Sequence, residues 1–480
     1  MIYHSTRDLS LAATGAEAIV AGIAPDGGLY VPEVLPKIDR SAWRGASFQD
    51  MACGIFRLFF DELEDDLPGI VKAAYASFDD PAIAPVRVVN ERLALLELWH
   101  GPTLAFKDIA LQALPHLMQA ALKALGRQEK VLILTATSGD TGKAAMAGFA
   151  DVKDSGVIVY YPADGVSEAQ RRQMLTHGED NTIALGVEGN FDDCQAGVKR
   201  LFADRVLQET LAARGIRLSS ANSINIGRLV PQITYYFTAY EALVRKGVLE
   251  DGQPLDLTVP TGNFGDFLAG VYAKEMGLPL GQMTVASNAN HVLTDFGETG
   301  VYDANRPLVL TASPSMDILI SSNLERYLFL RLGDAEKVRA LMTELRETGR
   351  FALQKLDGVR WGWADETAVF ATIRDLYESD RVTIDPHTAV AVDVARQVSD
   401  GFQLVLSTAS AYKFPREVLT ALGREVPETL EAQWEALQEA SKLPVPQPIQ
   451  KLRSARPRLE HRVAVDAMRE SVLEFAKGVF

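Results

Sequence analysis

Cysteine is almost absent from this chain, whose 480 residues include two, Cys53 and Cys194. Two thiols cannot build the cross-linked framework of a small secreted domain, and this cysteine usage is typical of a reducing compartment. The sequence has no apolar run of about 18 residues or more, which excludes a membrane-spanning helix. No basic segment followed by an apolar one occurs near Met1, so we expect no signal peptide. We therefore expect a cytoplasmic protein with no membrane partner.

Positive charge is also scarce. The chain has 48 Lys and Arg residues against 63 Asp and Glu residues, a net charge of −15, which argues against a nucleic-acid partner. The 7 histidines are scattered without a close pair at metal-ligand spacing, so we expect no metal site. No obligate protein partner is evident, and the expected partner is a small-molecule substrate.

The apolar content of 47% suffices for a large core and for two or three domains. Apolar segments that predict strands alternate with predicted helices from residue 86 onward. The predicted strands are 94–98, 131–136, 157–161, 183–187, 256–260, 283–287 and 402–407. This alternation predicts an α/β fold of mostly parallel, twisted sheets with helices on both faces.

We expect an N-terminal accessory domain over residues 1–80, a catalytic region over 81–425 and a C-terminal helical segment over 426–480. The catalytic region would contain two α/β subdomains, the smaller at about 110–220. The N-terminal domain should be rich in helix, because Phe48, Met51, Ile55, Leu58 and Phe59 follow helical spacing. The basic stretch 451–462 is interpreted as a solvated linker, since charge runs are usually solvated.

One lysine, Lys107, directly follows the predicted strand, in Gly101-Pro-Thr-Leu-Ala-Phe-Lys-Asp108. A lysine in an apolar turn loses its proton more easily than a solvated one, and a neutral amine condenses with aldehydes. Pyridoxal phosphate is such an aldehyde, and its enzymes hold it as a lysine Schiff base. Lys107 is a candidate for this role, although a single lysine is more often a solvated surface charge.

Two glycine-rich turns also follow predicted strands and precede predicted helices. They are Ser138-Gly-Asp-Thr-Gly142 and Gly262-Asn-Phe-Gly-Asp266. Glycine lets the backbone approach a ligand, and the helix N-terminus offers free N–H groups to an anion. The second turn has neither P-loop nor dinucleotide-fingerprint spacing. We expect Asp140, in the first turn, to cap its helix and point away from the anion.

Lys107, Ser138, Gly262 and Thr408 each follow a predicted strand. Ligands of parallel sheets bind beyond the carboxyl ends of the strands. These four positions can therefore meet in one site, which makes the combination more specific than any single turn.

Over nearly its whole length the chain resembles the threonine synthases, pyridoxal-phosphate enzymes of the tryptophan-synthase-β fold type. The stretches that carry the resemblance are Tyr3-His4-Ser5-Thr6-Arg7, Asp26-Gly27-Gly28-Leu29-Tyr30-Val31-Pro32, His100-Gly-Pro-Thr-Leu-Ala-Phe-Lys-Asp108, Ser138-Gly-Asp-Thr-Gly142, Asn222-Ser-Ile-Asn-Ile-Gly-Arg228, Gly262-Asn-Phe-Gly-Asp266, Ser313-Pro-Ser-Met-Asp-Ile-Leu-Ile-Ser-Ser-Asn323 and Asp385-Pro-His-Thr-Ala389. One departure lies in Thr408-Ala-Ser-Ala-Tyr-Lys-Phe414, where the family often has histidine and this chain has Ser410.

The resemblance implies that the protein converts O-phospho-L-homoserine and water to L-threonine and phosphate by γ-elimination and β-hydration. It implies that Lys107 binds pyridoxal 5'-phosphate and then serves as the acid–base group. Thr408 would face the pyridine nitrogen of the cofactor. The residues implied for its phosphate are Gly262, Asn263, Phe264, Gly265 and Asp266.

The resemblance also implies a substrate site. Ser138, Gly139 and Thr141 would bind the carboxylate. The residues considered for the substrate phosphate are Lys143, Ser223, Asn225 and Arg228. Arg228 could grip a phosphate bidentately or, equally, be a salt-bridged helix residue. His387 is expected to be a helix N-terminal residue rather than a catalytic base.

Three alternatives stay open. A related phospho-lyase would eliminate phosphate but form a product other than threonine, which product analysis would reveal. The N-terminal segment with Asp26-Gly-Gly-Leu-Tyr-Val-Pro argues against a serine or threonine dehydratase. The intact Lys107 motif argues against a binding protein that has lost catalysis.

Overall fold

The computed structural model describes residues 1–137, 140–164, 166, 168–176 and 179–480. Its larger sheet has six strands in the order β14-β11-β10-β15-β5-β4. Their bounds are β14 (Val359–Trp363), β11 (Leu280–Ser287), β10 (Leu255–Pro260), β15 (Gln403–Ser407), β5 (Leu93–Glu97) and β4 (Val86–Asn90). All pairs are parallel except β4 with β5, which is antiparallel.

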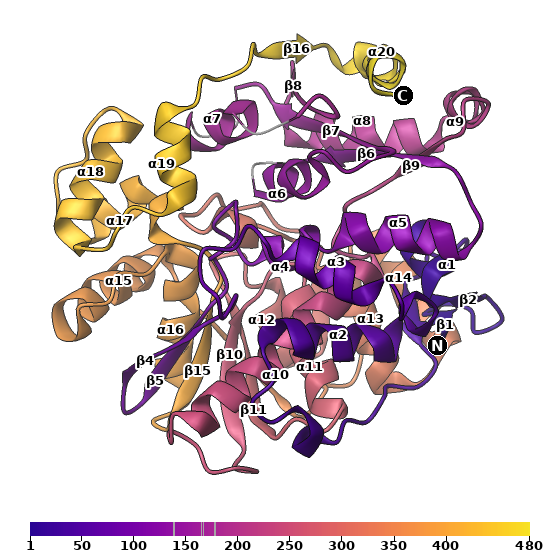
Figure 1. Cartoon of the computed structure of the whole chain (residues 1–480). Helices are drawn as coiled ribbons and strands as arrows, with labels where there is room; N and C mark the ends of the chain where they lie inside the picture. The colour runs from indigo at the N-terminus through magenta and orange to yellow at the C-terminus, as the bar shows by residue number, and fades with distance from the viewer. Residues whose placement is uncertain (138–139, 165, 167, 177–178) are drawn as a thin grey trace.

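A second, five-stranded sheet lies above the first in Figure 1 and has the order β16-β8-β7-β6-β9. Its strands are β16 (His461–Val463), β8 (Thr182–Val187), β7 (Ser155–Pro162), β6 (Lys130–Ala136) and β9 (Ile216–Ser219), all paired in parallel. Two mostly parallel sheets with helices between their strands confirm the predicted fold class. The predicted strands are all present, and within these two sheets β4, β9, β14 and β16 are additional.

Both faces of each sheet are buried, which explains why the strands are almost continuously apolar. Ala94 and Leu96 of β5 pack into one core, whereas Leu93 and Leu95 pack into another. Such alternation follows from side chains pointing to opposite faces along a strand. A third core lies between the five-stranded sheet and the helices α8 (Phe191–Ala203), α9 (Arg205–Ala212) and α20 (Met468–Val479).

The long helix α10 (Ile226–Arg245) is buried along most of its length and packs against α2 (Phe48–Phe59), α4 (Lys107–Leu111) and α11 (Gly265–Glu275). On the opposite face of the larger sheet, α16 (Pro386–Val398) packs against β10, β11, β14 and β15. Other helices are α5 (Leu114–Ala124), α6 (Asp140–Phe149), α7 (Glu168–Thr176), α12 (Val292–Thr299), α13 (Leu324–Leu332), α14 (Ala335–Thr348) and α15 (Glu366–Asp380). A short antiparallel pair joins β12 (Val301–Asp303) to β13 (Arg350–Ala352).

The N-terminal region combines helices with a small antiparallel sheet that the sequence did not predict. The sheet has the order β2-β1-β3, with β1 (Ile2–Ser5), β2 (Ala12–Thr14) and β3 (Tyr30–Pro32). The helices are α1 (Gly15–Ala21), α2 and α3 (Leu67–Ala74). Four of the five residues predicted for the buried face of α2 are buried, Leu58 is half-buried, and Phe56 is also buried.

The C-terminal region consists of α17 (Pro415–Ala421), α18 (Leu430–Ser441), α19 (Gln447–Ser454), β16 and α20. The basic stretch 451–462 is therefore more than a solvated linker. It includes the end of α19, and its last residues belong to β16, which adds to the edge of the smaller sheet through pairing with β8. No helix in the described part of the chain is long and apolar enough to cross a membrane.

Candidate active site

The chain segments that follow β5 and β15 are joined to each other beyond the carboxyl ends of these neighbouring strands. The N–H of Phe106 donates to the carbonyl of Thr408 at 2.8 Å, and the N–H of Ser410 donates to that of Leu104 at 3.1 Å. These bonds bring Thr408 next to the start of α4, where Lys107 is the first residue. Parallel strands end at the same edge of a sheet, so the sequence predicted this meeting point correctly.

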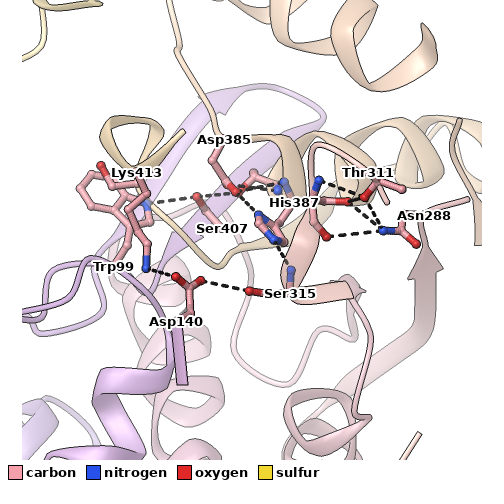
Figure 2. Close-up of polar contacts among 12 residues, drawn as sticks. Trp99, Asp140, Asn288, Thr311, Ser315, Asp385, His387, Ser407 and Lys413 are labelled. Carbon is pink, nitrogen blue, oxygen red and sulfur yellow. Dashed lines mark hydrogen bonds and ion pairs between the residues drawn. The ribbon is translucent and has the colours of Figure 1, made fainter. Parts of the chain in front are cut away.

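The amine of Lys107 contacts Ser315, a residue that the sequence did not single out. Lys107 Nζ donates to Ser315 Oγ at 3.1 Å. The same hydroxyl donates to Asp140 Oδ2 at 3.0 Å. The other oxygen of Asp140 forms an ion pair with Lys413 at 2.7 Å. Figure 2 shows Asp140 between Ser315 and Lys413.

The helix cap expected of Asp140 comes from Thr137 instead, whose Oγ1 accepts from the N–H of Gly142 at 3.3 Å, and Asp140 contacts Ser315 and Lys413. Lys413 is 6% exposed and Asp140 is 7% exposed. A buried ammonium group is costly unless a counter-charge and hydrogen bonds compensate it. Asp140 supplies the counter-charge, which explains why its carboxylate faces Lys413.

The glycine-rich turn after β10 lies against the segment that carries Ser315. A Cβ added at Gly262 would lie 3.1 Å from the carbonyl oxygen of Ser315 and 3.0 Å from Ile318 Cδ1. Because Ser315 also contacts Lys107, the lysine and the glycine-rich turn belong to one site. The close approach explains why glycine suits this position.

The carbonyl groups of this turn are held by the segment 321–323. Ser321 Oγ donates to the carbonyl of Gly262 at 2.7 Å, and the N–H of Asn323 donates to the carbonyl of Asn263 at 3.0 Å. The four N–H groups from Gly262 to Gly265 donate no hydrogen bond within the described part of the chain. They precede α11, so the helix dipole adds to their attraction for an anion.

The side chains of Phe264 and Asp266 are used by the fold. Phe264 has a left-handed backbone with a φ of 65°, and its ring packs near those of Phe267 and Tyr327. Asp266 Oδ1 accepts hydrogen bonds from the hydroxyls of Tyr235 and Tyr236. The turn can therefore offer backbone N–H groups to an anion, whereas these two side chains anchor the turn.

Several cationic side chains surround the amine of Lys107. Lys413 and Arg228 each lower the pKa of Lys107, and Lys413 also acts on Lys143. The acidic members of the cluster are Asp140 and Asp108. Basic side chains outnumber acidic ones in this cluster, although the whole chain carries a net charge of −15. Such a site favours an anionic ligand.

Burial and these neighbours shift the pKa values of the central groups. Burial lowers the pKa of Lys107 to about 8, although Asp140 favours the charged form. Burial alone would raise the pKa of Asp140, but Lys413 and Lys107 overcome this effect and hold it well below its usual range. Lys107 can therefore exist as amine or ammonium near neutral pH, which acid–base catalysis requires.

Lys143 and Thr141 follow Asp140 on α6. The side chain of Lys143 is buried, and its Nζ has no hydrogen-bond partner in the described part of the chain. Burial, followed by the charge of Lys413, places the pKa of Lys143 well below its ordinary value. Thr141 is half-buried. The other two residues predicted for the substrate carboxylate, Ser138 and Gly139, lie outside the described residues.

The remaining predicted residues lie at the start of α10. Asn225 caps this helix by accepting from the N–H of Gly227 at 2.9 Å, and its amide donates to the carbonyl of Ile19 at 2.9 Å. The oxygen and the nitrogen of the Asn225 side chain are thus both used in contacts that hold the fold together. Arg228 donates through Nη1 to the carbonyl of Ala221 at 2.8 Å, whereas its buried Nε has no hydrogen-bond partner in the residues described.

Ser223 lies near the glycine-rich turn. Its hydroxyl is 3.3 Å from that of Ser322, and Ser322 Oγ in turn donates to Asn263 Oδ1 at 3.0 Å. The carbonyl of Ser223 accepts from Asn323 Nδ2 at 3.3 Å. Ser223 is therefore adjacent to the turn that the sequence assigned to the cofactor phosphate.

His387 lies in the first turn of α16, as expected, and it also contacts the site. Its Nδ1 is 2.7 Å from Asp385 Oδ2, and its Nε2 accepts from the N–H of Ser315 at 3.2 Å. A backbone N–H can only donate, so Nε2 lacks a proton and Nδ1 carries it. Ser410, at the position where a histidine is frequent, caps the short helix η4 (Ala411–Lys413) by accepting from the N–H of Tyr412 at 3.3 Å.

Comparison with known proteins agrees with this geometry. Residues 86–407 match the family model described as "Pyridoxal-phosphate dependent enzyme", residues 2–75 match "Threonine synthase N terminus" and residues 388–461 match "Threonine synthase, C-terminal". The fold and the site thus define a member of the pyridoxal-phosphate-dependent enzymes.

Comparison with individual relatives shows which family of these enzymes the chain belongs to. The threonine synthase of Pseudomonas aeruginosa is 40% identical over 439 residues, which cover 87% of this chain and 90% of that protein. The structure titled PLP-bound threonine synthase from Brucella melitensis has a TM-score of 0.89 and 36% identity, covering 99% of this chain and 100% of that chain. The chain belongs to the threonine synthase family.

Another relative is longer. Threonine synthase-like 1 of Homo sapiens is 39% identical over 457 residues, which cover 89% of this chain. The chain spans only 61% of the length of that protein.

Proposed function

We propose that the protein is a threonine synthase, which converts O-phospho-L-homoserine and water to L-threonine and phosphate with pyridoxal 5'-phosphate as cofactor. The observation that carries this proposal is the position of the Lys107 amine. It lies in a buried cluster rich in basic side chains and, through Ser315, next to the free N–H groups of the turn at Gly262–Asp266.

The described residues fit the cofactor. The amine of Lys107 would bind its aldehyde, and the N–H groups of Gly262, Asn263, Phe264 and Gly265 would hold its phosphate. Thr408, which directly follows β15, would face the ring nitrogen. When bound, the cofactor stabilises negative charge on the substrate carbon next to the amino group.

Lys107 would then hold and transfer the protons of the reaction. With a pKa of about 8, it is partly amine and partly ammonium near neutral pH. One group can therefore remove a proton at one stage and return it at another, without help from a second base.

The substrate phosphate would be bound by Lys143, Arg228 and Ser223. The buried Nζ of Lys143 and Nε of Arg228, both without partners among the described residues, offer donors to an anion. Asn225 would contribute indirectly, because its side chain fixes the start of α10. Thr141 would bind the carboxylate together with Ser138 and Gly139.

A second candidate is a threonine-synthase-like phospho-lyase that releases phosphate without making threonine. One relative, from Homo sapiens, bears the name threonine synthase-like 1 rather than threonine synthase. Both candidates predict phosphate release from O-phospho-L-homoserine, but threonine forms only under the first. Chromatographic analysis of the amino-acid products therefore separates them.

The test of the proposed function compares the wild type with Lys107→Ala. We expect one threonine for each phosphate in the wild type and a loss of both products by about 10²-fold or more in the variant, the size of an acid–base contribution. Lys153→Ala is the matched control, because that side chain is 92% exposed. Wild-type activity in Lys107→Ala would refute the assignment.

The expected location and partners also remain proposals. We propose a cytoplasmic enzyme that acts on a small molecule. The scarcity of cysteine, with two in 480 residues, supports a reducing compartment.

A further inference from the structure

The hydroxyl of Ser315 is the link between the amine of Lys107 and a buried ion pair. It accepts from Lys107 Nζ at 3.1 Å and donates to Asp140 Oδ2 at 3.0 Å. No ion pair joins Lys107 to Asp140 directly among the residues that the structure describes. The serine hydroxyl therefore bridges the amine and the carboxylate, whose charge also acts on Lys107 through space.

The position of Ser315 is determined from both sides. Its N–H donates to His387 Nε2 at 3.2 Å, and Asp385 holds the other nitrogen of that ring at 2.7 Å. On the other side of the segment, Asn288 Nδ2 donates to Ser313 Oγ at 3.0 Å and to Asp317 Oδ1 at 2.8 Å. Figure 2 shows His387 between Asp385 and Ser315. A hydroxyl held in this way is preorganised for its partners.

We propose that Ser315 is a positioning residue, which holds the free amine of Lys107 and connects it to the Asp140–Lys413 pair, so that this pair controls when the amine carries a proton. The inference rests on the proposed function for its consequence in catalysis. Its physical content concerns only residues of this chain.

The two members of the ion pair act on Lys107 with opposite sign. Asp140, on α6, favours the ammonium form, and Lys413, on η4, favours the amine. The other charged groups that face Lys107 are Arg228 of α10, which favours the amine, and Asp108 of α4, which favours the ammonium form. The serine hydroxyl also favours the ammonium form, because a hydrogen bond from a charged donor is stronger than one from a neutral donor.

Removing the hydroxyl of Ser315 and removing the charge of Lys413 should therefore shift the pKa of Lys107 in opposite directions. In Ser315→Ala the pKa of Lys107 should fall below about 8 by about one pH unit, the size expected for one charge-assisted hydrogen bond. In Lys413→Met it should rise, because a repelling cation is lost and Asp140 is left with Lys107 as its nearest cation. A general loss of structure would not move the two variants in opposite directions.

The experiment is competitive labelling of the full chain, freed of bound cofactor, with trace acetic anhydride from pH 6 to pH 10. Mass spectrometry of the peptide that contains Lys107 reports the fraction of free amine at each pH. Ser315→Thr keeps the hydroxyl and should restore the wild-type titration. Ser155→Ala removes a buried hydroxyl that donates to the carbonyl of Val152, outside the contacts around Ser315, so it is the matched control.

The direction in which the titration of Lys107 shifts in each variant decides whether the proposal holds. An unchanged titration in Ser315→Ala, or shifts of the same sign in Ser315→Ala and Lys413→Met, would overturn the proposal. In the loaded enzyme, the acid limb of the pH profile of kcat should move with the labelling titration in Ser315→Ala. If the labelling titration shifts as expected but the wild type forms no threonine, the proposed function is wrong. The control of the Lys107 proton through Ser315 is then still supported.

Discussion

Replacement of Asp266 by Asn should change how the stability of the protein depends on pH. The carboxylate is 6% exposed, and its Oδ2 has no hydrogen-bond partner in the described part of the chain. Burial raises the pKa of Asp266 from 3.8 to about 6, although hydrogen bonds from Tyr235 and Tyr236 oppose the rise. The native state therefore holds a proton on this group more tightly than the unfolded state does.

The sign of the effect follows from this difference. Between about pH 4 and pH 6 the native state binds more protons than the unfolded state, so the free energy of unfolding falls as pH rises. A pKa rise of about two units corresponds to about 3 kcal/mol. The charged carboxylate thus destabilises the native state by up to about 3 kcal/mol above pH 6, and by nothing below pH 4.

Asparagine has the size of aspartate and no charge, so it resembles the protonated side chain at every pH. The free energy of unfolding of Asp266→Asn, relative to wild type, should increase by about 3 kcal/mol between pH 4 and pH 7. Urea unfolding followed by intrinsic fluorescence measures this change, since the ring centroid of Trp361 lies 6.2 Å from that of Phe264 beside the turn. Asp357→Asn, on the exposed surface, is the control.

A gap between Asp266→Asn and wild type that is constant from pH 4 to pH 7 would refute the reasoning. It would mean that the carboxylate keeps its ordinary affinity for protons despite its burial. The same variant also tests the turn, because backbone N–H groups are proposed to hold the cofactor phosphate. Cofactor affinity should therefore change by no more than about threefold, well below one charge-assisted contact.

Two further predictions concern other buried positions. Burial would lower the pKa of His100, but hydrogen bonds to Asp79 and Glu97 raise it to about 9. The stabilisation by protonated His100 is complete below pH 6.5 and is lost as pH rises through 9. His100→Gln should therefore lower the urea midpoint at pH 6 and have little effect near pH 10. Equal losses at both pH values would contradict this direction of the pH dependence. In Gly297→Ala the new Cβ would lie 2.1 Å from Trp361 Cδ2, so we expect a loss of about 1–3 kcal/mol by urea unfolding. Gly69→Ala in α3, with nothing within 4 Å, should cost no stability, and a similar loss there would show that crowding at Trp361 is not the cause.

The sequence predicted the central strands because both faces of each sheet are buried. Leu93–Glu97 and Lys130–Ala136 are therefore almost wholly apolar and easy to recognise. The strands that were not predicted are short or mixed. Residues 359–363 alternate large and small or charged side chains, and His461 and Arg462 of β16 are exposed. Their strand conformation depends on pairing with β11 and β8, which local sequence does not reveal.

The sequence located Lys107, the turn at Gly262 and Thr408 for a similar reason. Each comes after the end of a predicted strand, and parallel strands end at a common edge. Ser315 follows no strand. It reaches Lys107, 208 positions away in the sequence, because Asn288 and His387 hold its segment. Only its place in the quoted motif from Ser313 to Asn323 could have drawn attention to it.

Lys413 and Asp140 were visible in the sequence but could not be paired from it, since they come from η4 and α6, on segments that follow strands of different sheets.

Two other basic side chains of the cluster, Lys143 and Arg228, take no part in this ion pair. Burying Lys143 and Arg228 with donor atoms that have no partner in the described residues costs stability. A fold tolerates such a cost where a ligand supplies the missing partner. An anionic ligand such as a phosphate offers acceptor oxygens to both donors and a charge opposite to that of Arg228. These buried donors therefore support an anionic ligand in this cluster, independently of the similarity to known enzymes.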